Sequence, residues 1–567
     1  MNMSEGAREG WEILIFVSFL LGMTPLLGGY IARVFSGKPM FMRSLLGGLE
    51  RSCYWIAGVD AREEMSWTLY AKNLLIFHAW GLILLFSIQR AQGFLPFNPE
   101  GLGSIPWPLA LNNSLSFVTN TNWQSYAGEV TMSYFTQMVG VTVQNFLSAA
   151  TGMGVLLALI RGITRQTMET IGNFWVDLVQ SVVYLLLPLS LLFALLLVCE
   201  GVVETFSSYT EYTTLEGREQ ALPLGPVASQ VAIKQLGSNG GGFFGANGAH
   251  PLENPSPLSN FFEMIAILLI PAASTYAYGK MIGSRKEGRV LLISMGLLWV
   301  AGLSLALYSE HLYNPVLDLY PVLEGKETRL GTQNAITWVV STTATSNGSV
   351  NSSLSSLSPL AGGVALLNMM LGELIFGGVG VGLCSMIMFV LLTVFLSGLM
   401  VGRTPEYLGK KIEKREMQWV MLAVLAPGAL VLMGSGFSII QPASVSGLLH
   451  RGPHGLSEMI YAFTSTATNN GSAFGGLKTD TTYYHLLLGV VMLLGRLSIL
   501  LPSLAIAGLL VRKKQIPASV GTFSTENSLF CILLLSVILI VGALAFFPAL
   551  SLGPIVEHLL MVENRSF

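Results

Sequence analysis

Long apolar runs separated by short polar stretches are the main pattern along the chain. A helix rises about 1.5 Å per residue, so about 20 apolar residues cross the hydrocarbon core of a bilayer. The first run is interpreted as a span, because residues 1–10 carry Arg8 against Glu5 and Glu9 where a signal peptide needs a basic segment. Ten runs predict membrane-spanning helices: Trp11–Ile31, Asn73–Ile88, Val139–Ile160, Phe174–Cys199, Leu258–Ile282, Val290–Tyr308, Leu360–Gly402, Met417–Ile440, Tyr483–Val511 and Ser528–Leu550.

The composition also indicates a membrane protein. The 567 residues are 52% hydrophobic and only 11% charged, against roughly 25% charged in soluble domains. The four cysteines lie far apart and form no CxxC pair, which indicates buried thiols. A formal net charge of -2 provides no basic surface for nucleic acid. Together these observations exclude a soluble enzyme, a secreted disulfide scaffold, a disordered protein and a nucleic-acid-binding protein.

Lys and Arg are distributed unequally between alternate loops. Of the 30 basic residues, 20 lie in loops on one side of the predicted membrane, nine lie on the other side, and Arg496 falls within a span. Because cytoplasmic loops are enriched in Lys and Arg, the richer side is predicted to be cytoplasmic and both termini are predicted to lie outside. Basic clusters such as residues 410–415 could also contact anionic membrane lipid.

Four outer loops repeat one another. Each contains a short, moderately apolar stretch (residues 106–118, 223–236, 332–344 and 454–467) followed by a motif rich in Thr, Ser, Asn and Gly. Aligned on Asn122, Asn239, Asn347 and Asn470, the motifs are 117, 108 and 123 residues apart. The stretches are too short to span a membrane and predict re-entrant helices. Backbone that turns back within a bilayer must be buried in protein or line a wet cavity, which points to a pore.

The predicted fold is therefore an all-α polytopic membrane protein. Ten transmembrane helices would include four pseudo-symmetric repeats of helix, pore helix, filter and helix around a central pore. Ordinary polar loops between helices are the alternative. The expected boundaries are 1–35 for an extra N-terminal helix, 70–162, 172–284, 288–403 and 416–513 for the four repeats, and 524–552 for an extra C-terminal helix.

The chemistry of these loops suits a monovalent cation. Backbone carbonyl oxygens from four loops can replace the water shell of an ion, and glycine allows the backbone to expose them. The C-terminal ends of the pore helices add partial negative charge. Because the loops lack acidic side chains, K⁺ fits better than Ca²⁺ or Mg²⁺. The residues predicted to form a K⁺ filter through their backbone carbonyls are Thr121, Asn122, Gln124, Ser238, Asn239, Gly240, Ser346, Asn347, Gly348, Asn469, Asn470 and Gly471.

Four longer blocks are similar to one known family. Residues 118–124 (VTNTNWQ), 237–255 (GSNGGGFFGANGAHPLENP), 402–411 (GRTPEYLGKK) and 469–474 (NNGSAF) resemble the potassium-binding A subunit of Kdp-type potassium-importing P-type ATPases. The resemblance implies a member of the superfamily of potassium transporters that selects extracellular K⁺ and passes it through a tunnel to a P-type catalytic subunit, which alone uses ATP. It also implies small single-span accessory subunits and a bacterial or archaeal plasma (inner) membrane.

The first filter differs from the others in the alignment on Asn. Trp123 then stands where the other repeats have glycine, so the predicted pore is only pseudo-fourfold. Gln124 is predicted to influence selectivity, and the alternative is that it merely braces the loop.

The seventh span is unusually rich in glycine, at Gly372, Gly377, Gly378, Gly380 and Gly382. Each glycine weakens a helix by up to about 1 kcal/mol relative to alanine. A broken helix or intramembrane loop below the third filter is therefore predicted, as in transporters with discontinuous helices. The resemblance implies that this loop is a gate, and close helix packing through small residues is the alternative.

Two charges lie within the predicted spans. Glu373 and Arg496 each cost about 2.5 to 3.5 kcal/mol at the bilayer centre, so a paired or water-lined setting is expected. Arg496 is predicted to lie beneath the filter near the gate loop, where its charge would repel K⁺ from a straight path into the cytoplasm. A purely structural salt bridge is the alternative.

The chain carries no motif for energy conversion. Residues 240–245 formally satisfy GxGxxG without a surrounding βαβ unit, and GxxxxGK[ST], HExxH and DKTG are missing. We therefore expect a non-catalytic pore subunit of an ATP-driven K⁺ importer, with no covalently bound cofactor. A free-standing K⁺ channel or cation symporter of the same superfamily is the alternative, and an intramembrane enzyme ranks third. No metal-ligand spacing is recognised among His78, His250, His311, His450, His454, His485 and His558.

Overall fold

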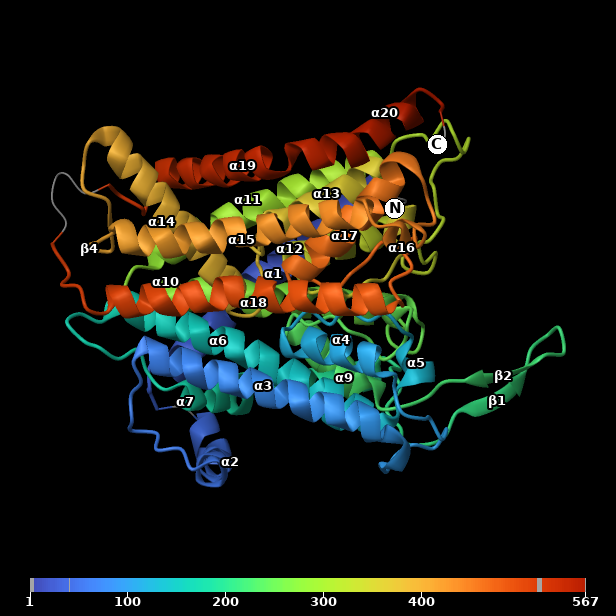
Figure 1. Cartoon of the computed structure of the whole chain (residues 1–567), viewed down its shortest axis with the longest axis horizontal. Helices are drawn as coiled ribbons and strands as arrows, with labels where there is room; N and C mark the ends of the chain where they lie inside the picture. The colour runs from blue at the N-terminus through green and yellow to red at the C-terminus, as the bar shows by residue number, and fades with distance from the viewer. Residues whose placement is uncertain (1–4, 40, 518–522, 566–567) are drawn as a thin grey trace.

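The chain folds into one bundle of long helices that run side by side (Figure 1). The computed structural model describes residues 5–39, 41–517 and 523–565. Two small antiparallel hairpins are the β-structure of this part of the chain. They are formed by β1 (Thr210–Thr213) with β2 (Glu219–Leu222), and by β3 (Glu406–Tyr407) with β4 (Lys410–Lys411).

Four consecutive units share the order of long helix, short helix, loop and long helix. The first contains α3 (Trp67–Ala91), α4 (Trp107–Val118), and a π-helical turn η2 (Thr136–Thr142) continued by α6 (Val143–Thr164). The second contains α7 (Phe174–Gln180), η3 (Ser181–Leu186), α8 (Leu187–Cys199), α9 (Val227–Leu236) and α10 (Pro257–Met281). The third contains α11 (Arg285–Glu310), α12 (Thr332–Ala344), α13 (Pro359–Met370) and α14 (Val381–Val401). The fourth contains α15 (Lys414–Ile439), α16 (Pro442–Val445), α17 (Gly452–Ala467) and α18 (Thr482–Leu510).

The remaining helices flank these units or lie in their loops. Before the first unit are α1 (Glu5–Phe35) and α2 (Phe41–Ala57), and after the last are α19 (Ser528–Leu550), η6 (Ser551–Ile555) and α20 (Val556–Val562). Single-turn elements are η1 (Gln92–Phe94), α5 (Gly128–Thr131), η4 (Asn247–Ala249) and η5 (Leu354–Ser356). Of these helices, α2 was not predicted; its exposed Phe41 and Trp55 suit a helix lying at the membrane surface.

Ten helices of the described residues are long and apolar enough to span a membrane, as predicted. The four predicted re-entrant stretches are helical and correspond to α4, α9, α12 and α17. The predicted break in the seventh span is also confirmed, because α13 and α14 are separate helices. The predicted fold class is therefore correct, while the exact repeat boundaries remain a prediction.

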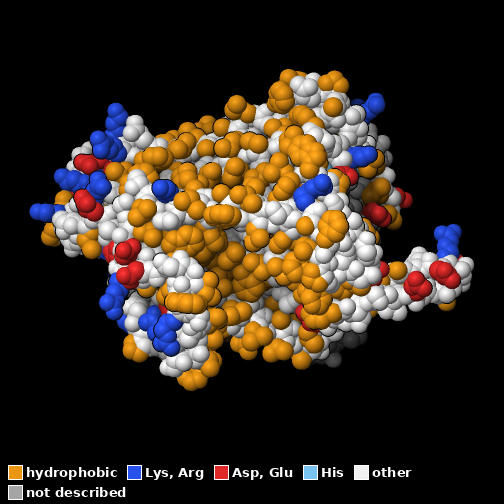
Figure 2. Space-filling view, turned by 60° about the horizontal axis from the view of Figure 1, so that its bottom comes forward, with side chains coloured by type: hydrophobic (Ala, Val, Ile, Leu, Met, Phe, Trp, Pro, Cys, Tyr) orange, Lys and Arg blue, Asp and Glu red, His pale blue; other side chains and the backbone are white. Residues whose placement is uncertain are grey.

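Within each unit the second long helix is the inner one. In α6, α10, α14 and α18, 67–83% of the residues in the most apolar stretch of the helix are buried. In the first helices of the units the share is 28–39%. The inner helices thus surround the centre of the bundle, and the outer helices leave most of their apolar side chains exposed on its surface, as contact with lipid would require. Figure 2 shows hydrophobic side chains over the middle of the molecule and charged side chains gathered toward its ends.

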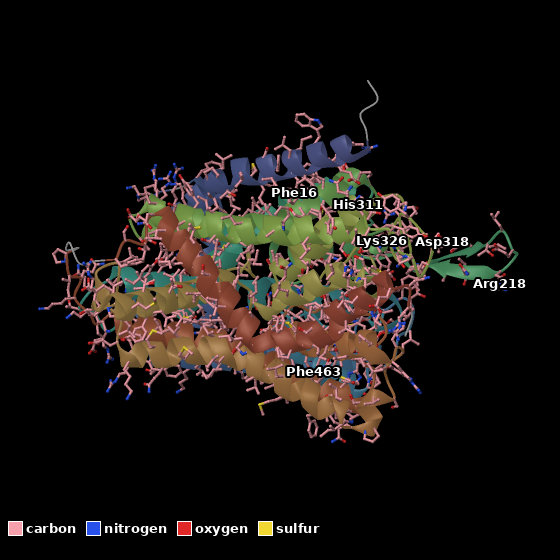
Figure 3. The ribbon with its side chains drawn as sticks, turned by 90° about the horizontal axis from the view of Figure 1, so that it is seen from above. Phe16, Arg218, His311, Asp318, Lys326 and Phe463 are labelled. Atoms are coloured by element: carbon pink, nitrogen blue, oxygen red, sulfur yellow. The ribbon has the colours of Figure 1, made fainter. Side chains whose placement is uncertain are left out.

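The two ends of the bundle differ in chemistry. Lys and Arg cluster at one end (Figure 2), where α2 and the β3–β4 hairpin lie (Figure 1). The opposite end carries both chain ends, the β1–β2 hairpin and the short helix α5 (Figure 1). Arg218, His311, Asp318 and Lys326 all lie toward this second end (Figure 3). The arrangement agrees with the predicted separation of basic loops from pore loops.

Candidate ion-selectivity filter

The four loops that follow the short helices share one backbone conformation. Each has two residues with positive φ, separated by one residue. These pairs are Asn120 and Asn122, Ser238 and Gly240, Ser346 and Gly348, and Asn469 and Gly471, with φ between 51° and 97°. The shared geometry identifies the loops as equivalent segments, which we call filter segments 1 to 4 (residues 119–123, 237–241, 345–349 and 468–472).

The shared backbone conformation corrects the alignment of filter segment 1. Asn122 has φ 55° and occupies the position of the filter glycines, so Thr121 corresponds to Asn239. Trp123 corresponds to Gly241, and the prediction that a tryptophan replaces a filter glycine is wrong. An asparagine suits this position because its short polar side chain tolerates the left-handed conformation better than most residues do.

Glycines of three segments touch the carbonyl oxygen of the next segment around a ring. A methyl group added to any of them would overlap that oxygen. The contacts are Gly240 against Asn347, Gly348 against Asn470, and Gly471 against Thr121. Segment 2 therefore adjoins segment 3, segment 3 adjoins segment 4, and segment 4 adjoins segment 1. The ring closes where Gly241 of segment 2 approaches Asn122 of segment 1.

Asparagine amides tie the same ring together. At least one Nδ2 donor crosses each of the four junctions. The hydrogen bonds are Asn120 to Ser238 O (2.8 Å), Asn239 to Asn120 Oδ1 (2.7 Å), Asn347 to Lys234 O (3.2 Å), Asn470 to Thr342 O (3.0 Å) and Asn469 to Thr121 Oγ1 (2.8 Å). These side chains are buried, and such bonds contribute about 1 kcal/mol each. The asparagines therefore brace the filter through their side chains. Asn120 was missed by the sequence alignment, although it stands two residues before Asn122.

The four segments open onto one shared cavity. Asn122, Gly240, Gly348 and Gly471 all line a hollow of about 230 Å³, together with Gln124. We call this hollow the vestibule. Because one residue from the equivalent position of every segment reaches it, the segments converge on a single axis.

Gln124 both lines the vestibule and braces it. Its Oε1 accepts a hydrogen bond from the Gly242 amide (2.9 Å), and its Nε2 donates to the Gly242 carbonyl (3.2 Å). Tyr126 supports the same Nε2 at 3.1 Å. Gln124 thus faces the vestibule and links the residues that follow segments 1 and 2, which agrees with a bracing role, while its influence on selectivity stays a prediction.

A buried ion pair lies directly behind filter segment 2. Lys234 and Glu253 are in contact, and both side chains are completely buried. Lys234 Nζ also donates to Asn247 Oδ1 (2.8 Å), and Asn247 Nδ2 donates to Gly240 O (2.7 Å). Lys234 is thus a support of the filter, whereas the sequence pattern assigned it to an outer loop. Only its position at the end of a pore helix could have suggested this.

The glycine-rich segment between α13 and α14 lies below the filter. A methyl group on Gly380 would overlap the carbonyl oxygen of Gly152 in α6, so the segment packs directly on an inner helix. Gly378 lies near the carbonyl oxygen of Thr345, at the inner end of filter segment 3. Gly372 and Gly380 have φ of 86° and 81°, which interrupts the helix. The glycines therefore allow both the break and the close packing.

Arg496 connects this segment to the filter. Its Nη2 donates to the Ser148 carbonyl (3.1 Å), and Ser148 Oγ donates to Asn120 Oδ1 (2.8 Å) in filter segment 1. The same guanidinium faces Gly152, against which Val379 packs. The prediction that Arg496 lies near the glycine-rich segment is confirmed.

The two charges within the predicted spans, Glu373 and Arg496, are both buried and are not in direct contact. Glu373 lies close enough to Arg496 for an electrostatic interaction, but the two side chains form no direct ion pair within the residues that the structure describes. Glu373 Oε2 and Arg496 Nε are buried and have no hydrogen-bond partner among those residues. A buried, unsatisfied charge is costly, which is typical of groups that face an ion or water path.

Comparison with known proteins shows the family of this chain. The family model described as "Potassium-transporting ATPase A subunit" matches residues 14–559. The chain belongs to this family. Potassium-transporting ATPase potassium-binding subunits from Rhizobium rhizogenes and Leptospira interrogans are 50% and 51% identical to it, with 99% of this chain and 100% of each relative covered. The corresponding subunit from Pseudomonas aeruginosa is 51% identical and covers 96% of this chain and 98% of its own length.

One solved structure has a similar fold. The potassium transporter TrkH from Vibrio parahaemolyticus superposes with a TM-score of 0.50, covering 86% of this chain and 95% of TrkH. The sequence identity is 16%, so this likeness concerns the fold alone. This chain and TrkH thus share a helical membrane architecture.

Proposed function

We propose that this chain is the K⁺-selecting subunit of an ATP-driven importer. In this proposal K⁺ enters from outside through the vestibule, loses its water in the ring of filter segments, and is coordinated by backbone carbonyls of those segments. The basic end of the bundle would then face the cytoplasm and both termini would lie outside, in a bacterial or archaeal plasma (inner) membrane.

The observation that carries this proposal is the ring itself. Carbonyl oxygens of Thr121, Asn347 and Asn470 lie at three junctions of the ring, where only glycine fits on the neighbouring segment. Neutral carbonyl dipoles can replace the hydration shell of a large monovalent ion without the carboxylates that a divalent ion favours. Side-chain amides hold the junctions, and some of them bind filter carbonyls such as those of Ser238 and Gly240, so the ion would be coordinated by the carbonyls that these amides do not occupy.

The path below the filter supports a sideways transfer. A K⁺ ion that leaves the filter would meet the glycine-rich gate segment and the buried charge of Arg496. Repulsion by this guanidinium would oppose direct passage into the cytoplasm, so ions would leave the pore toward a P-type catalytic subunit that alone hydrolyses ATP. Small single-span accessory subunits would complete the complex, as the family resemblance implies.

Co-expression with the P-type and accessory subunits of the same host tests this function. The complex should purify intact in mild detergent, hydrolyse ATP faster when K⁺ is added, and take up K⁺ into vesicles only with ATP. Gly348→Ala should shift the K⁺ stimulation to much higher K⁺ concentrations, whereas Gly436→Ala, at a helical glycine with open space around it, should not. A K⁺ conductance of the isolated chain without ATP would instead support a free-standing channel.

A further inference from the structure

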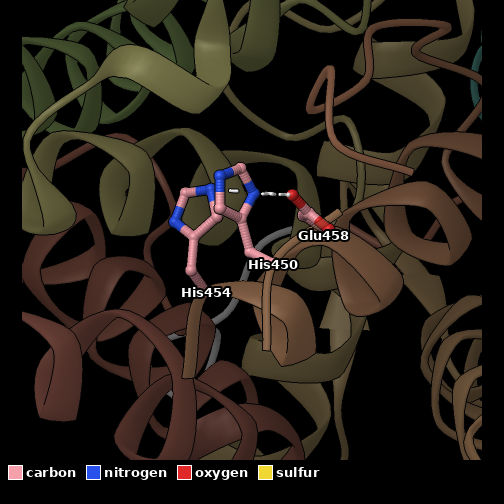
Figure 4. A group of neighbouring side chains, drawn as sticks. All are labelled: His450, His454 and Glu458. Carbon is pink, nitrogen blue, oxygen red and sulfur yellow. Dashed lines mark hydrogen bonds and ion pairs between the residues drawn. The ribbon is translucent and has the colours of Figure 1, made fainter. Parts of the chain in front are cut away.

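A cluster of two histidines and one glutamate lies at the start of pore helix α17. His450 precedes the helix, and His454 and Glu458 follow within it, so the three residues are four positions apart (Figure 4). The sequence pattern did not predict a metal site among the histidines, yet one ligand atom from each of these residues lies within 4.8 Å of the others. We infer that His450, His454 and Glu458 form a Zn²⁺ site.

In the part of the chain that the structure describes, two donor atoms of the cluster have no partner, and the third, His450 Nδ1, is hydrogen-bonded only within the cluster, to Glu458, in a contact that a metal would replace. Glu458 is 1% exposed and His454 is 8% exposed. His454 Nε2 and Glu458 Oε2 are buried and have no hydrogen-bond partner among the described residues. His454 Nε2 lies 3.9 Å from Glu458 Oε1, and His450 Nδ1 lies 2.6 Å from the same oxygen. A tetrahedral Zn²⁺ with ligands at about 2.1 Å separates neighbouring donors by roughly 3.4 Å, so small side-chain rotations suffice.

A further carboxylate orients His454 as metal sites require. Glu557 Oε1 in α20 lies 2.8 Å from His454 Nδ1. When Nδ1 carries the ring proton and donates a hydrogen bond to this carboxylate, Nε2 carries no proton. Its lone pair is then free to bind a metal next to Glu458. Zinc-binding histidines generally donate their second ring nitrogen to a carboxylate or carbonyl in this way, which fixes the ring and raises its basicity.

The surroundings of the cluster fit a built site. Phe474 stacks on the His454 ring at an interplanar angle of 14°. Gly476 leaves the space that the Glu458 carboxylate occupies, because a side chain there would overlap it. The two carboxylates, Glu458 and Glu557, balance the charge of a divalent cation, and imidazole nitrogen selects Zn²⁺ over Mg²⁺ or Ca²⁺. Three protein ligands leave a fourth position for water.

The site would connect three elements near the filter. A bound Zn²⁺ would tie His450, in the loop before α17, to the pore helix itself, and through His454 and Glu557 to α20. Because α17 leads directly into filter segment 4, the bound metal would hold the start of this pore helix in place and so stabilise the side of the vestibule that segment 4 forms.

Zinc binding by the purified full chain tests the inference. Zn²⁺ alone is titrated in competition with a chromogenic chelator, and the melting temperature is recorded with and without the metal. The expected result is one Zn²⁺ per chain, with a melting temperature that rises on binding. His450→Gln, at a half-exposed side chain, and Glu458→Gln should each weaken binding at least tenfold, and Glu557→Gln about tenfold. His311→Ala, at the same end of the bundle, should bind zinc as the unchanged chain does.

Folding is monitored separately, by a single symmetrical peak in size-exclusion chromatography. If His450→Gln and Glu458→Gln are both folded and bind Zn²⁺ as tightly as the unchanged chain, the site is wrong. Equal affinity for Ca²⁺ and Zn²⁺ would also contradict it, since a site with two imidazoles should prefer zinc.

Discussion

Filter segment 1 differs from segments 2 to 4 at the position that carries the second positive φ. Segments 2 to 4 have glycine there, whereas segment 1 has Asn122. At the three glycines a neighbouring carbonyl oxygen fills the place of a side chain, so both the conformation and the space require glycine. At Asn122 only the positive φ restricts the choice of residue, because there is space for a side chain, and Asn122 Nδ2 donates a hydrogen bond to Asn145 Oδ1 (2.8 Å). Close approach of segments, more than backbone conformation, thus explains the filter glycines.

The largest effect is expected from a side chain placed at one of these three glycines, where it would collide with the neighbouring carbonyl oxygen. In Gly348→Ala the added methyl group would overlap the Asn470 carbonyl oxygen. The alanine would also have to keep φ near 90°, a conformation that strains every residue except glycine. We expect K⁺ affinity to fall by at least ~100-fold, corresponding to ~3 kcal/mol. The measurement is the K⁺ concentration for half-maximal ATPase activity of the complex. Unchanged affinity would show that this junction does not shape the ion site.

The next largest effect is expected at Arg496, which lies below the filter beside the glycine-rich segment. Arg496→Ala removes the buried charge below segment 1, so K⁺ flux should become partly independent of ATP, while Arg496→Lys keeps the charge and should retain coupling. Uptake of K⁺ or Rb⁺ into vesicles with and without ATP measures the difference. If Arg496→Ala left flux wholly dependent on ATP at the original rate, the barrier role would be wrong.

Gln124 tests how far segment 1 controls entry. Gln124→Arg would place a cation in the vestibule and break the paired hydrogen bonds with Gly242, so the half-maximal K⁺ concentration should rise about tenfold. Gln124→Ala loses the bonds without adding charge and serves as the matched control. Equal effects in both variants would mean that bracing, rather than charge, accounts for the change.

The smallest effect is expected from making segment 1 resemble the others. Asn122→Gly keeps the left-handed conformation and loses one hydrogen bond to Asn145, worth about 1 kcal/mol. K⁺ affinity should therefore change by less than about fivefold. A loss as large as that of Gly348→Ala would contradict the contrast between the segments.

Much of this architecture follows from local patterns. The stretch 332–344 was predicted as a re-entrant helix, and α12 has the same bounds, because its apolar residues end at a polar, glycine-containing loop. The break near Gly380 was equally visible, since several glycines interrupt one apolar run. Such features depend on neighbours in the sequence.

Contacts between distant segments could not be predicted. The motif Thr119–Gln124 contains two asparagines two positions apart, and which of them takes the glycine position is shown by the backbone conformation and by the packing against Gly241 and Gly471. The role of Lys234 depends on Glu253 and the filter backbone, which are brought together by the fold. The carboxylate of Glu557 likewise reaches His454 across 103 residues of chain.

The β1–β2 hairpin projects well beyond the rest of the molecule (Figure 1). Its strands are almost wholly exposed and its turn contains Gly217 with φ 77°, so it contributes little to the core. An antibody epitope inserted at this turn would be displayed on the same face as the vestibule. Its detection on intact cells, before any permeabilisation, would report directly which compartment the pore mouth faces.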